Sequence, residues 1–210
     1  VFAALLLAAG ASAENCLWKV ATEDGTLYLQ GSIHILKPED HPLPPAIQTA
    51  YTKSDVVVFE TDMAEMMSPQ TQKVILDKAL LKGDATLEGL LDNAVYRRLD
   101  QALGEIGLPI AAFQKFEPWF AAMTLTLAKM QAMGLDPQHG LEQHFQTQAE
   151  ADGKPVVGLE SVEFQIGLLE SLSESNPNDF VDRALEDLAM VEDNVDRLLA
   201  AWKNGDLETL

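Results

Sequence analysis

The chain has 210 residues, 47% of them hydrophobic, which is enough for one α/β domain with a sizeable core. It carries 14 Lys and Arg against 33 Asp and Glu, a formal net charge of -19. This balance argues against nucleic acid as a partner, because affinity for nucleic acid depends on cations that neutralise phosphates. The same charge disfavours anionic membrane surfaces.

The first thirteen residues are not expected to be part of the fold. Residues 2–9 form a short apolar run, and Ala11-Ser12-Ala13 has the small-x-small form of a signal-peptidase site. The run is too short to span a bilayer. We therefore expect residues 1–13 to be the remainder of a signal peptide. The mature protein would start at Glu14 and be exported, to the periplasm or the extracellular space.

Cys16 is the single cysteine of the chain. In an exported protein a lone cysteine indicates either a buried thiol or a disulfide partner outside these 210 residues. A lipid-anchored export signal places a small apolar triplet directly before its cysteine, whereas Glu14-Asn15 stand here. No stable membrane anchor is therefore expected.

The N-terminal part of the fold is predicted to be a β-hairpin followed by a strand–helix–strand unit. Apolar alternation on both sides of residues 23–26 predicts a hairpin over 18–29, whose returning strand continues through Gly31-Ser32-Ile33-His34. A proline-rich loop and a short helix over 46–51 lead to a buried strand over 55–60. Such crossovers join parallel strands, so we expect the carboxyl ends of these two strands at one sheet edge.

The middle of the chain is predicted to be helical, and a third strand follows it. Four helices are expected. Two of them begin at Ser68-Pro69 and at Pro118, and the other two cover 90–103 and 140–151. The third strand covers 154–160, and helices follow over 162–172 and from Asn176-Pro177 to Trp202. The predicted fold class is α/β, with an N-terminal β-hairpin and a mostly parallel central sheet that carries a large helical insertion or cap.

Each of the three strand-like runs ends in a polar residue: His34, Glu60 and Glu160. In open α/β sheets, ligands bind in the crevice at the carboxyl ends of the strands. Glu60 directly follows four apolar residues, so we expect it to be shielded from water and to need a partner. Asp62 shares this role or caps the next helix. The alternative for Glu160 is a place in the N-terminal turn of the following helix.

Two further residues are expected near this crevice. Glu142 lies close to the start of its helix and can reach the crevice, and Gln165 can point back toward the same edge. His144 lies two positions after Glu142, so both cannot face one site. His41 and His139 fall in loops and receive no role.

The His/Glu/Glu set supports two kinds of chemistry. It can bind a divalent ion that activates water, or it can act without metal, with His34 as a base that a glutamate orients. The sequence contains neither a His-Glu-x-x-His motif nor a Gly-x-Ser-x-Gly elbow.

The sequence also resembles a known family. Leu17-Trp18-Lys19-Val20 and the run 27–36, which contains Gly31-Ser32-Ile33-His34, resemble the opening of TraB/PrgY/GumN proteins, which include the TIKI metalloproteases. Residues 58–62, 140–145 and 153–160 resemble its later blocks, with Gln165 following. The resemblance implies an α/β core with a helical insertion. Family members carry two Gly-x-x-His motifs and this sequence has one, so 14–210 is expected to be such a domain without its C-terminal part.

The resemblance implies an exported, metal-dependent, peptidase-like hydrolase. His34, Glu60 and Glu160 would then be catalytic and would bind the metal (Mn, Co or Zn), while Glu142 and Gln165 would serve substrate binding. The substrate would be a peptide or a small molecule. Other branches of the family leave two alternatives, a non-catalytic peptide-binding or inhibitory module and a metal-free, esterase-like hydrolase.

Overall fold

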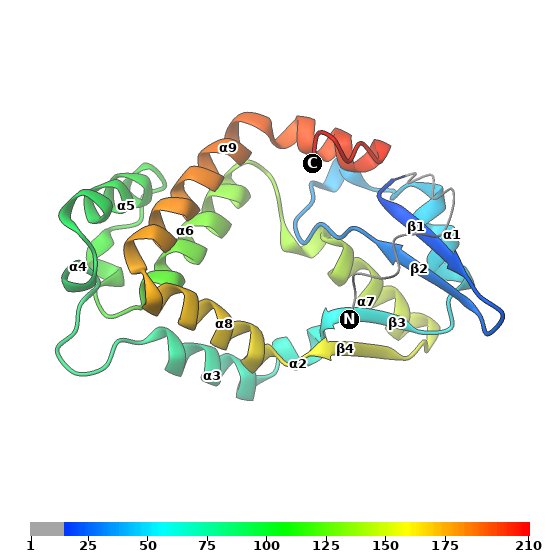
Figure 1. The fold of residues 1–210 in the computed structure, drawn as a ribbon, viewed down its shortest axis with the longest axis horizontal. Coiled ribbons are helices and arrows are strands. Elements are labelled where there is room, and N and C mark those ends of the chain that lie inside the picture. Colours follow the sequence, from blue (N-terminus) through cyan, green and yellow to red (C-terminus); the bar gives the residue numbers. More distant parts are fainter. Residues whose placement is uncertain (1–14) are drawn as a thin grey trace.

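The computed structural model describes residues 15–210 and begins with the predicted hairpin (Figure 1). Strands β1 (Leu17–Ala21) and β2 (Thr26–Gln30) are antiparallel. The expected turn between them closes with a 2.8 Å hydrogen bond from the Thr22 amide to the Gly25 carbonyl. However, β2 ends at Gln30, four residues before the expected end of the strand.

The second expected sheet is also present, as a pair of parallel strands. β3 (Val57–Thr61) pairs with β4 (Val156–Glu160), so that Val57 lies opposite Val156 and Thr61 opposite Glu160. Within residues 15–210 the two strand pairs stay separate, and β2 does not join β3 by hydrogen bonds. After β2 the chain instead turns toward Asp136, where Leu36 forms an isolated bridge.

Helices make up most of the molecule. α1 (Pro45–Lys53) links the hairpin to β3, and α7 (Leu141–Asp152) precedes β4. The remaining helices are α2 (Met63–Met66), α3 (Pro69–Ala79), α4 (Leu87–Leu90), α5 (Asn93–Glu105), α6 (Pro118–Ala132), α8 (Val162–Ser175) and α9 (Pro177–Asn204), with short 3-10 turns η2 (Pro38–Asp40), η3 (Ile110–Phe113) and η4 (Pro137–His139). The α/β class with a large helical part is therefore confirmed.

Side-chain caps explain where several of these helices begin. Ser68 accepts a hydrogen bond from the Thr71 amide at the start of α3. Asn176 accepts one from the Asp179 amide at the start of α9. Such caps satisfy amides that have no partner within the helix, and a proline follows each cap at the first helical position.

The apolar residues form two cores, and α9 runs through both. One core lies among the hairpin, α1 and α7 and includes Trp202 at the end of α9. The other lies in the helical part and includes Val181 near the start of α9. Figure 1 shows α4 to α6 gathered beside α9, away from the strands. Across residues 15–210, the search for a helix long and apolar enough to cross a membrane finds none. The predicted leader, residues 1–13, lies outside the described residues.

Candidate functional site

The segment after β2 carries the first predicted site residue and is held at its start. The Gly31 amide donates to the Cys16 carbonyl at 2.8 Å, and the Trp202 indole Nε1 donates to the Gly31 carbonyl at 2.7 Å. A Cβ on Gly31 would lie only 3.2 Å from the Cys16 Cβ. Cys16 itself is buried, as one of its two expected alternatives requires, and burial raises the pKa of its thiol. The start of the Gly-x-x-His segment is therefore fixed against the end of α9.

The alternation of buried and exposed side chains continues beyond the end of β2. Ile33 packs against the core, whereas Ser32 and His34 are exposed. The alternation predicted for a strand thus holds, although the backbone no longer pairs as one. His34 points its ring away from the core as a consequence.

Gly140 allows α7 to approach His34. A Cβ on Gly140 would lie 2.0 Å from the His34 carbonyl oxygen, a distance that no side chain can occupy. The next amide, that of Leu141, donates to the Ile33 carbonyl at 3.0 Å. Glu142, in the first turn of α7, is therefore brought to the segment that carries His34.

Glu142 is the direct partner of His34. Its Oε1 lies 2.9 Å from His34 Nδ1, and the Ser32 hydroxyl donates to the same oxygen. The Glu142 side chain is 15% exposed and that of His34 is 67% exposed. Because Nδ1 faces the carboxylate, Nε2 is the nitrogen of His34 that can meet a substrate or an ion.

The contact shifts both pKa values. The hydrogen bond to Glu142 is the main cause that raises the pKa of His34, against partial burial and with help from the Glu142 and Glu60 charges. Burial disfavours the charge of Glu142, but the hydrogen bonds from His34 and Ser32 outweigh it and keep the pKa of Glu142 below its ordinary value. An ionised carboxylate beside a readily protonated imidazole is the result.

Glu60, Glu160 and Gln165 form a second group. The Gln165 side-chain amide lies 3.4 Å from a Glu60 oxygen and 3.3 Å from a Glu160 oxygen, at the long end of hydrogen bonding. With Leu159, Leu168 and Leu169 these residues line a hollow of about 410 Å³. The structure therefore brings together Glu60 and Glu160, which the sequence placed at strand ends, and Gln165 of α8, which was expected to point back toward the same edge.

The expectation that Glu60 is shielded from water is wrong. β3 turns Val57 and Phe59 toward the core, so Val58 and Glu60 share the opposite, exposed face. Asp62 takes its alternative role and caps α2, since it accepts hydrogen bonds from the amides of residues 64 and 65.

Within the described part of the chain, the two groups do not form one closed metal centre. The charge of Glu60 is the smallest of the causes that raise the pKa of His34. Among residues 15–210, no three His, Cys, Asp or Glu residues are arranged to hold one metal ion. By donor type, an imidazole nitrogen and carboxylate oxygens fit Mn²⁺, Co²⁺ or Zn²⁺.

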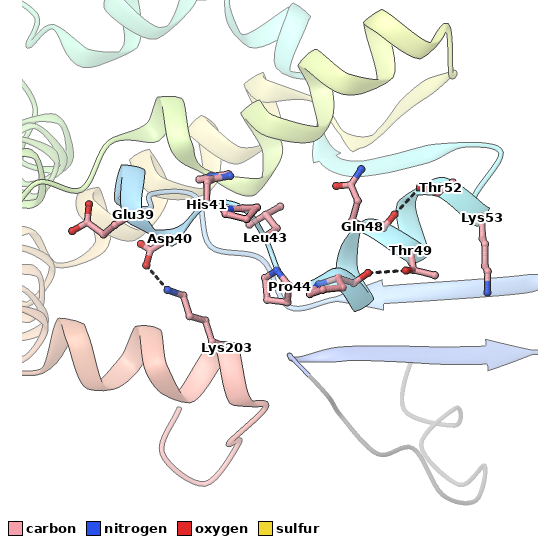
Figure 2. Close-up of a pocket in the computed structure, with 12 residues that line it drawn as sticks. Glu39, Asp40, His41, Leu43, Pro44, Gln48, Thr49, Thr52, Lys53 and Lys203 are labelled. Carbon is pink, nitrogen blue, oxygen red and sulfur yellow. Dashed lines mark hydrogen bonds and ion pairs between the residues drawn. The ribbon is translucent and has the colours of Figure 1, made fainter.

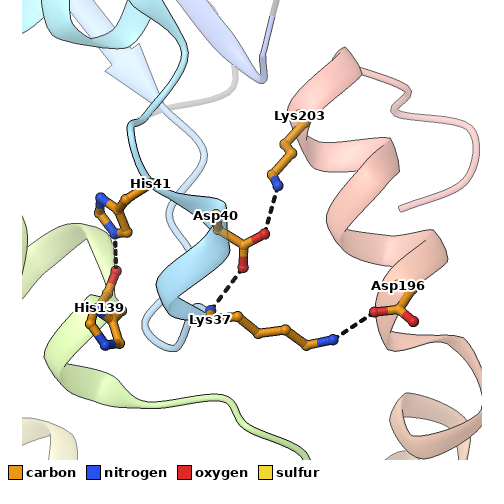
Figure 3. A network of polar contacts seen from close by, with 6 residues as sticks. All are labelled: Lys37, Asp40, His41, His139, Asp196 and Lys203. Carbon is orange, nitrogen blue, oxygen red and sulfur yellow. Dashed lines mark hydrogen bonds and ion pairs between the residues drawn. The ribbon is translucent and has the colours of Figure 1, made fainter.

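Three histidines outside the predicted site, His41, His139 and His144, lie together. The ring of His41 is 5.1 Å from that of His144 and 5.9 Å from that of His139, between centroids. A ring nitrogen of His41 also lies 2.8 Å from the His139 carbonyl (Figure 3). His144 Nε2 is buried and has no hydrogen-bond partner among residues 15–210, and burial and the nearby His41 lower the pKa of His144. Nothing local in the sequence indicated this cluster, because His41 and His139 are 98 positions apart.

A larger hollow of about 720 Å³ lies beside α1 and contains none of the predicted site residues (Figure 2). At one side of it Asp40 accepts from Lys203 Nζ at 2.6 Å and from the Lys37 amide at 2.8 Å. Lys37 in turn pairs with Asp196 of α9 at 2.7 Å (Figure 3). These contacts tie the proline-rich loop to α9 and give the hollow a structural explanation. Its lining residues are Glu39, Asp40, His41, Pro42, Leu43, Pro44, Pro45, Gln48, Thr49, Thr52, Lys53 and Lys203.

Fold and site together define an α/β protein that pairs a histidine after its hairpin with a glutamate at the start of α7 and carries two further glutamates near the ends of its parallel strands. A sequence profile of the TraB/PrgY/gumN family matches residues 16–210, and the chain belongs to this family. Two curated relatives are "Uncharacterized protein YbaP" of Escherichia coli (strain K12) and of Shigella flexneri. Each is 27% identical over 142 residues, which are 68% of this chain and 51% of the relative. The chain thus spans about half the length of the curated relatives it matches. No solved structure matches it.

Proposed function

We propose that the protein is an exported, metal-dependent hydrolase that acts on peptides, with His34 at the centre of its site. The observation that supports this most is the 2.9 Å contact between His34 Nδ1 and the shielded Glu142 carboxylate. It would fix the imidazole through Nδ1, so that Nε2 is the nitrogen that can meet an ion or accept a proton. Export is proposed from the leader-like residues 1–13 and the absence of a lipid-anchor pattern at Cys16.

In this proposal each residue has one task. His34, Glu60 and Glu160 would hold a divalent ion, which supplies an activated water when bound. Glu142 would position His34, and Gln165 would keep the two carboxylates side by side, as it does at 3.4 and 3.3 Å. As the alternative for Glu160, its carboxylate would accept the proton of the attacking water instead of binding the ion.

A metal-free hydrolase is the second candidate, and one observation favours it. The pair of His34 and Glu142 is complete without an ion, because a carboxylate at Nδ1 is the arrangement by which a histidine acts as general base through Nε2. His34 would then take the proton of water directly, and Glu142 would stabilise the imidazolium that forms.

The pH dependence follows from the raised pKa of His34. Both candidates need His34 neutral, either to bind an ion or to accept a proton. For the metal-free candidate, Glu142 raises that pKa above the ordinary 6.5, so the acid limb of the activity profile should lie above pH 6.5. In a Glu142→Gln variant the acid limb of the activity profile should move to lower pH. A limb that stays in place would contradict the assigned partnership.

Hydrolysis is tested with a pool of tryptic peptides analysed by mass spectrometry, with and without EDTA. The proposal expects new cleavage products that disappear with His34→Gln and with EDTA, while His139→Gln, outside the site, cleaves like the wild type. Products that survive EDTA but need His34 would identify the metal-free candidate. Peptides that are retained on the protein but remain intact would contradict both candidates and indicate a binding module.

A further inference from the structure

The segment that carries His34 lies outside the continuous strand ladders. Between β2 and η2, the described residues 31–37 form one isolated backbone bridge, from Leu36 to Asp136. A segment outside a ladder opens easily unless other contacts hold it. The position of His34 therefore depends on contacts from the elements around it.

On the N-terminal side of His34, the contact comes from Trp202 in the last turn of α9. Its indole Nε1 donates to the carbonyl of Gly31, three residues before His34, at 2.7 Å. The Gln30 side chain donates to the same carbonyl at 2.9 Å, but Gln30 is the chain neighbour of Gly31. Trp202, which is 2% exposed, is therefore the partner that ties this carbonyl to another element, in a place shielded from water.

On the C-terminal side of His34, two ion pairs come from the same end of α9 (Figure 3). Lys37 Nζ lies 2.7 Å from Asp196, whose side chain is 84% exposed, so this pair contributes little. Lys203 Nζ lies 2.6 Å from Asp40, whose side chain is only 6% exposed. A shielded carboxylate needs its cation, so the pair of Lys203 and Asp40 is the stronger connection.

We call Asp196, Trp202 and Lys203 the α9 clamp. The helix that carries the clamp is anchored in both cores, through Val181 near its start and Leu199 near its end. The clamp is therefore part of a fixed support, on which both flanks of the His34 segment rest.

We propose that the α9 clamp positions the site, with Trp202 as the residue that holds His34 within reach of its carboxylate partner. This inference rests on the proposed function, in which His34 is the centre of the site. The partner, Glu142, belongs to α7 and lies 2.9 Å from His34 Nδ1. Their contact joins α7 to a segment that α9 holds, so loss of the Trp202 hydrogen bond should loosen it.

The tautomer of His34 reports this positioning without any measure of activity. In the neutral ring, a carboxylate at Nδ1 keeps the proton on that nitrogen. Nitrogen-15 NMR distinguishes the Nδ1–H from the Nε2–H form at a pH where the ring is neutral. His34→Gln identifies the signals of this histidine.

Trp202→Phe removes the indole N–H and retains an aromatic ring. Trp119→Phe, in α6, is the matched control. Trp119 is also 2% exposed, but its Nε1 has no hydrogen-bond partner in the described part of the chain. Both substitutions remove the same atoms from a buried place, and only Trp202→Phe removes a hydrogen bond to the His34 segment.

The proposal expects the Nδ1–H form to dominate in the wild type and in Trp119→Phe. In Trp202→Phe the Nε2–H form should increase by about threefold or more, as for a weakened hydrogen bond. A His34 tautomer that Trp202→Phe leaves unchanged, or that both substitutions change equally, would overturn the proposal.

A second pair of variants tests the other flank and decides the question if Trp202→Phe does not fold. Lys203→Met should also increase the Nε2–H form of His34. Lys129→Met, which breaks ion pairs to Glu105 and Glu192, should not. Equal tautomer ratios in these two variants would overturn the proposal. No substrate is involved, so the result is independent of whether the protein hydrolyses peptides.

Discussion

Glu142 and His34 show how a buried partner sets the state of an exposed residue. His34 is mostly in solvent, and an isolated exposed histidine has no fixed ring orientation. Its orientation comes from Glu142, which Ser32 helps to hold ionised. The position of Glu142 in the first turn of α7 predicted that this residue lies near the crevice. The sequence did not predict that Glu142 pairs with His34. That pairing depends on a contact across 108 positions of sequence, which no local pattern encodes.

The Glu142 contact predicts the titration of His34. The pKa of His34 is raised in the folded protein, so the stability from this contact is fully present below pH 6.5 and is lost as the pH rises through the raised value. Glu142→Gln should therefore lower the pKa of His34 toward 6.5. Proton NMR of the ring C–H signals measures this shift, and an unchanged titration would show that Glu142 does not act on His34.

His144 predicts the opposite pH dependence. Burial and the neighbouring His41 lower its pKa, so below pH 6.5 the unfolded chain takes up the proton first. Stability should therefore fall as the pH drops from 6.5 through the lowered value. Thermal unfolding between pH 7.5 and 5 is the measurement, with about equal ionic strength throughout. In the His144→Phe variant the unfolding temperature should decrease less as the pH drops. A decrease in unfolding temperature equal to that of the wild type would contradict this role for His144.

At the scale of elements, the start of α7 positions the site. The helix begins directly against the backbone of His34, and the absence of a side chain at Gly140 makes this approach possible. A glycine before a helix is easily interpreted as a cap or a loop residue. Its steric role here becomes visible only when His34 is placed beside it.

Gly140→Ala tests this contact. The added methyl group would overlap the His34 carbonyl, and overpacking of this kind costs about 1–3 kcal/mol. The variant should also lower the pKa of His34, because displacement of α7 moves Glu142 away. Gly167→Ala, in α8, is the matched control, since its methyl group meets nothing within 4 Å. The control should stabilise by about 0.5–1 kcal/mol in chemical denaturation. Equal effects of the two substitutions would contradict the steric role of Gly140.

At the scale of the whole molecule, α9 joins the two cores. Its start packs among α5 and α6, and its end places Trp202 under Gly31. The apolar stripe of α9 was visible in the sequence, as were the hairpin and the strands β3 and β4, because these depend on local periodicity. The sequence did not show which side of β3 is exposed, because that depends on the packing of Phe59 against residues distant in the sequence. The separation of the two strand pairs was equally hidden from local patterns.

The central claim is that His34, Glu60 and Glu160 bind a divalent ion, and calorimetric titration tests it most directly. Mn²⁺, Co²⁺ and Zn²⁺ are titrated into the complete gene product and into its His34→Ala and Glu60→Ala variants. His139→Ala, which removes an imidazole from the cluster outside the site, is the control. The account predicts binding by the wild type and the control, weakened by about tenfold or more in each site variant, as for loss of a ligand. No binding by the wild type, or binding that only His139→Ala weakens, would contradict it.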